Sequence, residues 1–279
     1  MVVTIVGIGL IGGSMALALK GKGIITKVIG VDASISHQQK ALELGLADEI
    51  ANLEEAVKEA QIVILATPVN ALVQLVSEVL NNIDRQVVLD VGSTKGALLE
   101  AIQYHPKRGR FVATHPMWGT EYSGPEAAVN GAFTGKATVI CNKEESDPDA
   151  VELVEKIYRD LGMHLVYMTA HDHDVHVAYV SHISHITSFA LANTVLEKEK
   201  EEEAIFELAS GGFESTVRLA KSNPAMWVPI FKENRENVLD VLNEHISQLR
   251  KFKACLEKEN YEYLQELIED ANKIKRIIK

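Results

Sequence analysis

The strongest constraint on the fold is a glycine-rich turn near the start of the chain, between an apolar run and a helix-forming segment. Residues 2–6 read VVTIV, a β-branched run that is typical of a buried parallel strand. Residues 7–12 read GIGLIG, and one glycine later the helix-forming stretch SMALALKG follows. A GxGxxG turn between a strand and a helix is the sequence fingerprint of a dinucleotide-binding fold.

Each glycine of this turn has a physical reason. Gly7 permits the tight turn, Gly9 lets backbone N–H groups approach a pyrophosphate, and Gly12 lets the helix pack closely on the strand. The alternative is a glycine-rich turn that binds no ligand. The residues of this segment that we expect to contact a dinucleotide are Gly7, Gly9, Leu10, Ile11 and Gly12.

An acidic residue follows at the spacing that such a fold requires. The run KVIGVD predicts a second strand that ends in Asp32, 20 residues beyond Gly12. A carboxylate there accepts hydrogen bonds from an adenosine ribose and repels a 2′-phosphate. Residues 32–36 contain no arginine that could bind such a phosphate. The sequence therefore favours NAD over NADP as the cofactor.

Strand-like and helical segments alternate through the first half of the chain. This pattern predicts a Rossmann-type α/β fold with a doubly wound parallel sheet, in which ligands bind beyond the carboxyl ends of the strands. Further strand-like runs occupy residues 60–69, 86–96, 109–116 and 136–141, with helical stretches such as 53–60 and 70–80 between most of them.

Several polar or rigid residues fall at these carboxyl ends. Thr67 and Pro68 follow one strand and are expected to contact the cofactor, and Ser93 follows the next. His115 begins the segment HPMWGTEYSG, whose composition is typical of neither helix nor strand. A surface loop whose histidine has no role is one interpretation. We favour a loop that holds a proton-transfer group in the same crevice as the nicotinamide.

Composition narrows the classes of partner. The chain has 279 residues, enough for two modest domains, and its formal net charge is −11. This charge disfavours nucleic acid or an anionic membrane as the main partner, because both require a basic surface. Four glycines interrupt the first apolar run and no basic residue precedes it, so we expect no signal peptide. Cys141 and Cys255 lie far apart, which suits a reducing cytoplasm.

The second half of the chain reads differently. The strand pattern stops near residue 166, and the sequence predicts helices over 174–204, 225–256 and 260–278. We expect the charged segment 197–203 to be a solvated helix end or loop. The sequence thus predicts a dinucleotide-binding domain over 1–166 and an all-helical domain over 167–279. Long helices in a domain of this size often bury their apolar faces against a second copy, so we expect a homodimer.

Five of the ten histidines fall between residues 171 and 185. His182 and His185 have the i,i+3 spacing of metal ligands, but no third ligand stands out on the same helix, so we expect no metal site. For His173 and His176 we favour ordinary helix-face histidines.

A polar stripe crosses the same apolar helix. Ser181, His185 and Ser188 follow i, i+4, i+7, and a polar stripe on a core-facing helix needs partners, which a polar ligand would supply. Arg218 is a candidate to bind a carboxylate, because its planar guanidinium matches one bidentately. Trp227 is either a core residue or a wall of the ligand site.

Five segments together resemble the prephenate/arogenate dehydrogenase family of tyrosine biosynthesis. They are GIGLIGGS, DVGSTKG, THPMWGTEYSG, AHDHDVHVAYVSHISH and GGFESTVRLAKSNPAMW, in the order in which that family has them. The resemblance implies a Rossmann domain followed by a helical dimerisation domain. It also implies NAD-dependent oxidative decarboxylation of prephenate to 4-hydroxyphenylpyruvate, without a metal.

The resemblance also implies roles for single residues. His115 would accept the proton of the substrate's ring hydroxyl, and Ser93 would hydrogen-bond that histidine or that hydroxyl. His185 and Arg218 would bind substrate carboxylates. The full set implied for substrate binding is Thr120, His171, His185, Arg218 and Trp227.

Some positions depart from the family pattern. Ser184 stands where the family often has proline, so we expect His185 to be presented differently, and Glu214 and Ser215 change the charge near the substrate. The chain ends at Lys279, so we expect no regulatory domain. Alternatives are an arogenate dehydrogenase, a β-hydroxy acid dehydrogenase and, in a different class, a non-catalytic NAD-binding sensor.

Overall fold

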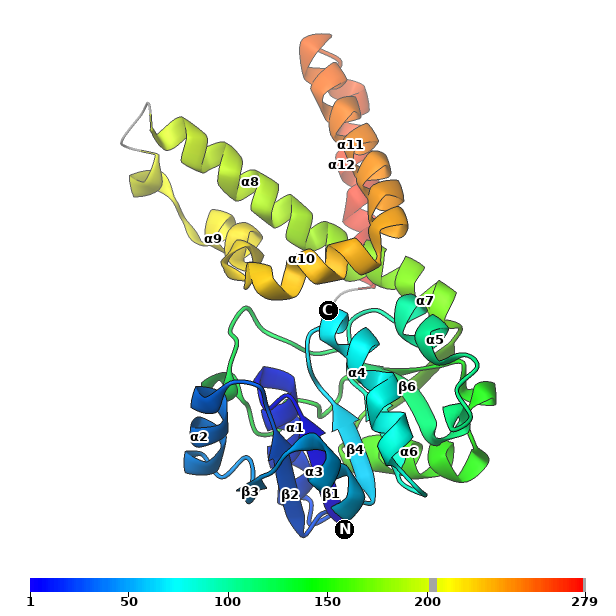
Figure 1. Cartoon of the computed structure of the whole chain (residues 1–279). Helices are drawn as coiled ribbons and strands as arrows, with labels where there is room; N and C mark the ends of the chain where they lie inside the picture. The colour runs from blue at the N-terminus through cyan, green and yellow to red at the C-terminus, as the bar shows by residue number, and fades with distance from the viewer. Residues whose placement is uncertain (201–204, 278–279) are drawn as a thin grey trace. The chain divides into compact units, whose positions relative to one another are not determined.

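The computed structural model describes residues 1–200 and 205–277, and it divides into two compact units (Figure 1). The first unit, Met1–Asn234, contains a sheet with its covering helices and a set of further helices. The second unit, Arg235–Lys279, contains α11 (Arg235–Glu257), α12 (Tyr261–Asn272) and the short η7 (Lys273–Arg276). The predicted helix over 225–256 is therefore two helices, separated at Asn234.

One eight-stranded sheet, in the order β3-β2-β1-β4-β5-β6-β7-β8, forms the centre of the first unit. The sequence reversal on either side of β1 and β4 is the doubly wound arrangement that the sequence predicts. The strands are β1 (Val2–Val6), β2 (Lys27–Val31), β3 (Glu49–Ile50), β4 (Ile62–Leu65), β5 (Val87–Asp90), β6 (Phe111–Pro116), β7 (Ala137–Cys141) and β8 (His164–Met168).

The sheet is not parallel throughout. β7 runs antiparallel to β6, with His115 opposite Val139, and β8 runs parallel to β7. The reason lies in the connections. Residues 117–136 contain only the short η2 (Pro125–Ala127), whereas the crossover between parallel strands is usually a helix. The helix α6 (Pro148–Asp160) provides such a crossover between β7 and β8.

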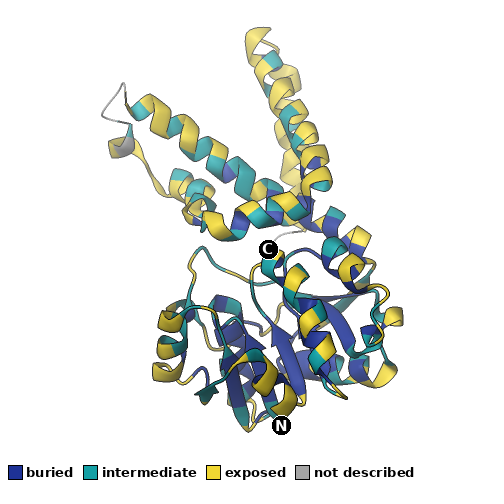
Figure 2. Cartoon of the chain, viewed as in Figure 1, coloured by how far each residue is buried: buried dark blue, intermediate teal, exposed yellow. Residues whose placement is uncertain are grey.

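Helices cover both faces of the sheet, and alternation along each strand decides which side chains they meet. Along β4, for example, Ile62 and Ile64 belong to one buried cluster while Val63 and Leu65 belong to the other. The first cluster packs against α1 (Leu10–Gly21), α2 (Ile35–Glu43) and α6, and the second against α3 (Leu53–Glu59), α4 (Val69–Asn82) and α5 (Gly96–Ile102). Figure 2 shows the strands as buried and the outer faces of these helices as exposed.

The remaining helices of the first unit begin directly after β8. They are α7 (Ala170–Val177), the π-helical turn η4 (Ala178–His182), α8 (Ile183–Glu199), η5 (Phe206–Leu208), α9 (Gly211–Val217), η6 (Arg218–Lys221) and α10 (Pro224–Glu233). The predicted helix over 174–204 is thus a helical run with a π-turn inside it. Its predicted end, and the end of the charged segment 197–203, lie outside the described residues.

Candidate active site

The glycine-rich turn has the geometry that its sequence predicts. Gly7 has φ of +91°, and a Cβ there would lie 2.7 Å from the carbonyl oxygen of Ala66. A Cβ on Gly12 would lie 2.0 Å from the oxygen of Gly7, whereas one on Gly9 would meet nothing within 4 Å. α1 begins at Leu10 without a side-chain cap or an acidic residue in its first turn. Its N–H groups and dipole are therefore available to an anion such as a pyrophosphate.

Asp32 stands at the end of β2, beside this turn. Its Oδ2 accepts a hydrogen bond from the backbone N–H of Ile8 over 2.9 Å, and its Oδ1 accepts one from Ser34 over 2.9 Å. The side chain is only 11% exposed, with His37 Nδ1 at 3.5 Å. The carboxylate thus lies between the glycine-rich turn and the start of α2, where the ribose of a bound dinucleotide would reach it.

Thr67 and Pro68 occupy the loop after β4. Pro68 is the N-cap residue of α4, and Thr67 lies against the turn, since a Cβ on Gly7 would be 3.0 Å from its nitrogen. The hydroxyl oxygen of Thr67 is buried, and no group in the described part of the chain hydrogen-bonds it. A buried polar atom without a partner fits a site whose ligand supplies one.

His115 lies in β6 rather than in a loop. The strand predicted over residues 109–116 is confirmed, since β6 spans Phe111–Pro116 and pairs with β7; the part of the HPMWGTEYSG segment that is neither helix nor strand begins only after Pro116. The apolar run Phe111–Ala113 leads into this pairing, and β7 supplies the hydrogen bonds of the pair. The half-buried imidazole is therefore attached to a backbone that the sheet holds in place.

A buried ion pair braces the neighbouring turn. The ammonium group of Lys95 contacts Asp90 Oδ2 and donates to the carbonyl oxygen of Gly92 over 2.8 Å, and the side chains of Lys95 and Asp90 are fully buried. Asp90 Oδ1 also accepts from the N–H of Thr114 over 3.0 Å. These contacts fix the turn that carries Ser93 against the end of β6.

Behind His115 lies a row of buried polar groups. His115 Nδ1 is 2.8 Å from Nε2 of His173, and His173 Nδ1 is 2.7 Å from Asp174 Oδ1. The carboxylate of Asp174 in turn accepts from the N–H groups of Lys95 and Gly96 at the start of α5. The prediction that His173 is an ordinary helix-face histidine is wrong, because its side chain is fully buried against His115. His176, in contrast, is exposed.

Burial sets the charge state of this row. Burial, reinforced by His173 and Lys95, holds the pKa of His115 well below its usual value. Burial also lowers the pKa of His173, although the hydrogen bond to Asp174 opposes the change. Burial alone would raise the pKa of Asp174, but hydrogen bonds from His173 and the Gly96 N–H lower it. Near neutral pH the two imidazoles are thus neutral and the carboxylate is charged.

A second pair of histidines follows on the next helical turns. Burial lowers the pKa of His182 to about 4, and its Nδ1 lies 3.2 Å from the Asn234 side-chain nitrogen, which also donates to the carbonyl oxygen of Asp174 over 2.7 Å. His185 stacks on Trp227 with 3.4 Å between ring centroids. Burial, and to a lesser degree Arg218, lowers the pKa of His185. The indole N–H of Trp227 is buried without a partner among the described residues.

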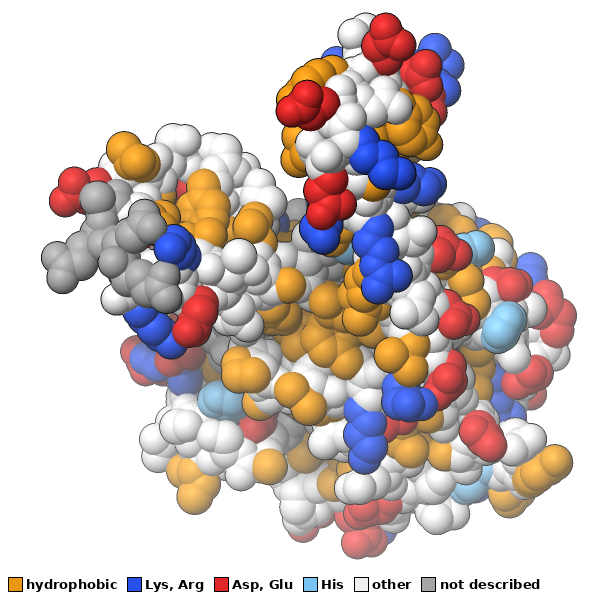
Figure 3. Space-filling view, turned by 90° about the horizontal axis from the view of Figure 1, so that it is seen from above, with side chains coloured by type: hydrophobic (Ala, Val, Ile, Leu, Met, Phe, Trp, Pro, Cys, Tyr) orange, Lys and Arg blue, Asp and Glu red, His pale blue; other side chains and the backbone are white. Residues whose placement is uncertain are grey.

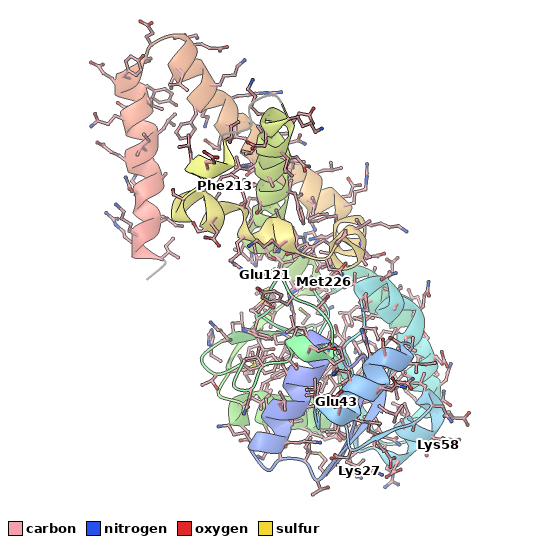
Figure 4. The ribbon with its side chains drawn as sticks, turned by 90° about the vertical axis from the view of Figure 1, so that its left-hand side faces the viewer. Lys27, Glu43, Lys58, Glu121, Phe213 and Met226 are labelled. Atoms are coloured by element: carbon pink, nitrogen blue, oxygen red, sulfur yellow. The ribbon has the colours of Figure 1, made fainter. Side chains whose placement is uncertain are left out.

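An ion pair joins the loop after β6 to the helices. Arg218 Nη1 donates to Glu121 Oε2 over 2.7 Å, and Figure 4 shows Glu121 on the loop that faces α9 and α10. Arg218 is half exposed, so its other guanidinium N–H groups can reach a ligand. Thr120 lies in the same loop, and its hydroxyl accepts from the N–H of Tyr122 over 3.3 Å.

The structure brings together most, but not all, of the residues that the sequence singles out. His171 is exposed on α7, about 200° around the helix from His173, and does not join the row. The hydroxyl of Ser188 donates to the carbonyl oxygen of Thr216 over 3.0 Å, so a group of the protein, rather than a ligand, accepts its hydrogen. Ser184 is exposed in α8, just after the π-helical turn.

Sequence reasoning missed several residues of the site, namely Asp90, Lys95, Glu121, Asp174 and Asn234. The signal for Asp174 was present, as an acidic residue on the apolar face of a helix. No group of three or more His, Cys, Asp or Glu side chains in the described residues could hold a metal ion. None of the described helices is both long and apolar enough to span a membrane.

Comparison with known proteins places this site in a family. A family model described as the nucleotide-binding domain of prephenate dehydrogenase matches residues 15–167, and one described as its dimerization domain matches residues 169–270. A prephenate dehydrogenase of Bacillus subtilis is 34% identical over 94% of this chain and 72% of its own length.

Solved structures agree. A prephenate dehydrogenase of Aquifex aeolicus, crystallised with hydroxyphenyl propionate and NAD+, is 32% identical, with a TM-score of 0.89 over 99% of this chain and 97% of its own. An arogenate dehydrogenase of Synechocystis is 27% identical, with a TM-score of 0.79 over the full length of both chains. With a Rossmann-type sheet, a helical region after it and these matches across nearly its whole length, this chain belongs to the prephenate dehydrogenase family.

Proposed function

We propose that this chain is an NAD-dependent prephenate dehydrogenase of tyrosine biosynthesis, which converts prephenate to 4-hydroxyphenylpyruvate and carbon dioxide. One observation supports this proposal above all others. A neutral imidazole, that of His115, lies near the carboxyl edge of the same sheet that carries the glycine-rich turn. A base and a dinucleotide site at one sheet edge suit the removal of a hydroxyl proton together with a hydride.

Several groups of the chain fit NAD. Bound NAD would accept the hydride from the carbinol carbon of the substrate. The N-terminus of α1 would bind the pyrophosphate and Asp32 the adenosine ribose. The hydroxyl of Thr67, which no described group hydrogen-bonds, would contact a polar atom of the cofactor. The residues that we assign to the cofactor are Gly7, Gly9, Leu10, Ile11, Gly12, Asp32, Thr67 and Pro68.

His115 moves the proton of the reaction. Its imidazole accepts the proton of the ring hydroxyl while the hydride leaves the carbon that carries this hydroxyl. Loss of carbon dioxide then makes the ring aromatic and leaves a phenolate oxygen, to which the imidazolium returns the proton. Such general base catalysis contributes about 10²–10⁴-fold to a rate. We assign Ser93 a hydrogen bond to the same hydroxyl or imidazole.

Groups on the helices bind the rest of the substrate. The guanidinium of Arg218 is suited to a carboxylate. His185 stacks on Trp227 and is close enough to Arg218 for the guanidinium to lower its pKa. The indole N–H of Trp227, which has no partner among the described residues, is a donor for a substrate oxygen. Thr120, on the loop that Glu121 ties to Arg218, completes this group. We make no such assignment for His171.

A homodimer in the cytoplasm is the proposed working form. We assign dinucleotide binding to residues 1–166, and substrate binding and dimerisation to residues 167–279. Apolar side chains remain exposed on the helices of the second unit, as the orange surfaces in Figure 3 illustrate, and the second family model describes a dimerization domain. Light scattering coupled to gel filtration tests this proposal, and a monomer at micromolar concentration would contradict it. The two cysteines are free and buried, which suits the cytoplasm.

The test of the activity is NADH formation from prephenate, followed by absorbance with NAD or NADP. We expect turnover with NAD, and NAD binding without turnover of any cyclohexadienyl substrate would favour the sensor alternative. Because a relative named arogenate dehydrogenase spans the whole chain, arogenate is the second candidate substrate. A higher kcat/KM for arogenate than for prephenate would assign the chain to that activity.

A further inference from the structure

We propose that His173 and Asp174 are positioning residues, which fix the proton of His115 on Nδ1 and thereby leave Nε2 as the free base. Only the role of Nε2 as the base that accepts the substrate's proton rests on the proposed function. The tautomer itself follows from the direction of the hydrogen bonds in the row His115–His173–Asp174.

The direction is set at the carboxylate end. Oδ2 of Asp174 lies 2.8 Å from the Gly96 nitrogen and 3.2 Å from the Lys95 nitrogen, and Oδ1 lies 2.9 Å from the Lys95 nitrogen. These backbone donors, at the start of α5, favour the charged carboxylate, which can only accept hydrogen bonds. The remaining partner of Oδ1, His173 Nδ1 at 2.7 Å, must therefore carry a hydrogen.

The direction then passes from one imidazole to the next. A neutral imidazole carries one hydrogen, so His173 with its hydrogen on Nδ1 has a bare Nε2 that accepts. The 2.8 Å contact between His173 Nε2 and His115 Nδ1 consequently requires a hydrogen on His115 Nδ1. A neutral His115 then has its lone pair on Nε2, the nitrogen that points away from His173 and is left for the substrate.

The same row stabilises the product of proton transfer. When His115 Nε2 accepts a proton, the new positive charge can be shared through the bond to His173, whose other nitrogen faces the negative carboxylate. The titratable groups that act on His115 from other elements are Lys95, in the turn after β5, and His182, in the π-helical turn. Asp90 acts on His173 from the end of β5. The Lys95 ammonium lowers the proton affinity of the row, and the carboxylates of Asp90 and Asp174 raise it; His182, with its pKa of about 4, carries no charge near neutral pH.

The direct experiment is ¹⁵N NMR of the histidine rings in the full-length wild-type chain with NAD bound, at neutral pH. Resonances of His115 are assigned by their loss in the His115→Asn variant. We expect a protonated Nδ1 and an unprotonated Nε2 for His115, and the same tautomer for His173. A protonated Nε2 on a neutral His115 would overturn the proposal, whatever the activity of the enzyme.

The Asp174→Asn variant provides a second test. The Lys95 and Gly96 N–H groups need an acceptor, so the amide oxygen should turn to them and the amide NH₂ should face His173. This reverses both tautomers and places the hydrogen of His115 on Nε2. We expect kcat for prephenate to fall about 10²–10⁴-fold, with KM and NAD affinity changed less than about twofold. The acidic limb of the pH–rate profile should shift as well.

Controls separate positioning from a general structural role. Asp172, exposed on the same helix two residues earlier, gives a matched Asp172→Asn variant that should keep the wild-type tautomer and kcat. His173→Gln keeps an acceptor for His115 and should retain more activity than His173→Leu. Equal losses in these two variants would indicate packing alone. The expected tautomer without turnover of prephenate would refute the proposed function but not the positioning.

Discussion

Lys95 and Asp90 form an ion pair in which both side chains are fully buried, at the turn between β5 and α5. The pair holds Gly92 and the end of β6 through further hydrogen bonds, so the geometry around Ser93 and His115 depends on it. A buried pair adds little net stability compared with apolar residues, but removal of one partner leaves an uncompensated buried charge.

The first prediction concerns this pair. Lys95→Met should lower the free energy of unfolding by about 3–5 kcal/mol, because Asp90 would remain buried without its cation. Urea denaturation followed by circular dichroism measures the change. The matched control is Lys58→Met, at an exposed ion pair with Glu54 on α3, where we expect no measurable change. Figure 4 shows Lys58 on the outer surface of the molecule. Equal stability of the two variants would contradict this account.

Arg218 is predicted to act on substrate affinity. Arg218→Gln should raise KM for prephenate by about 10–100-fold, since a charge-assisted hydrogen bond is worth about 1.5–3 kcal/mol. The Kd for NAD should not change. Steady-state kinetics give the first quantity and fluorescence titration the second. Arg159→Gln, a half-exposed arginine on α6, removes the same charge and should leave KM as it is. An unchanged KM in the Arg218 variant would remove the guanidinium from the substrate site.

Asp32 is predicted to select the cofactor. Asp32→Ser removes the carboxylate that would repel a 2′-phosphate, so the ratio of Kd for NADP to Kd for NAD should fall by at least about tenfold, or about 1.4 kcal/mol. Fluorescence titration with both cofactors measures the ratio. Glu43→Gln at the end of α2 is the control for a general change in charge, and its ratio should match that of the wild type. If both variants keep the wild-type ratio, Asp32 does not face the ribose.

His182 is predicted to make stability depend on pH. Its pKa falls from 6.5 in the unfolded chain to about 4 in the folded one, so the unfolded chain binds the proton more readily between these values. Stability from this residue is therefore complete above about pH 6.5 and is lost as the pH falls toward 4, by up to about 3 kcal/mol. Urea denaturation measures the free energy of unfolding of the wild type and of His182→Asn, a variant that keeps an acceptor for Asn234. This free energy should depend more steeply on pH in the wild type. His176→Asn, at an exposed histidine, should keep the wild-type slope.

The dinucleotide-binding half of the fold could be predicted from the sequence, because its signals are local. The glycine-rich turn, the β-branched runs and Asp32 all act on residues near them in the chain, so their pattern predicts the strands and the crevice. The antiparallel β6–β7 pair is different, because its cause is the lack of a helix over residues 117–136 rather than any property of the strands themselves.

The site was predictable only in part, for the same physical reason. His115 and Arg218 stand in motifs that suggest their chemistry. The burial of His173 depends on a partner 58 residues earlier in the chain, and the charge of Asp174 depends on N–H groups at the start of another helix, 79 and 78 residues earlier. Helical periodicity alone does not distinguish a histidine that faces such partners from one that faces water.

The central claim is that the imidazole of His115 accepts the proton as the hydride leaves the substrate. The most direct measurement is the rate of NADH formation in a single turnover, with His115→Asn and wild-type chains each saturated with NAD and prephenate. We predict a rate about 10²–10⁴-fold lower in the variant, with unchanged NAD affinity. A variant that forms NADH as fast as the wild type would contradict the claim.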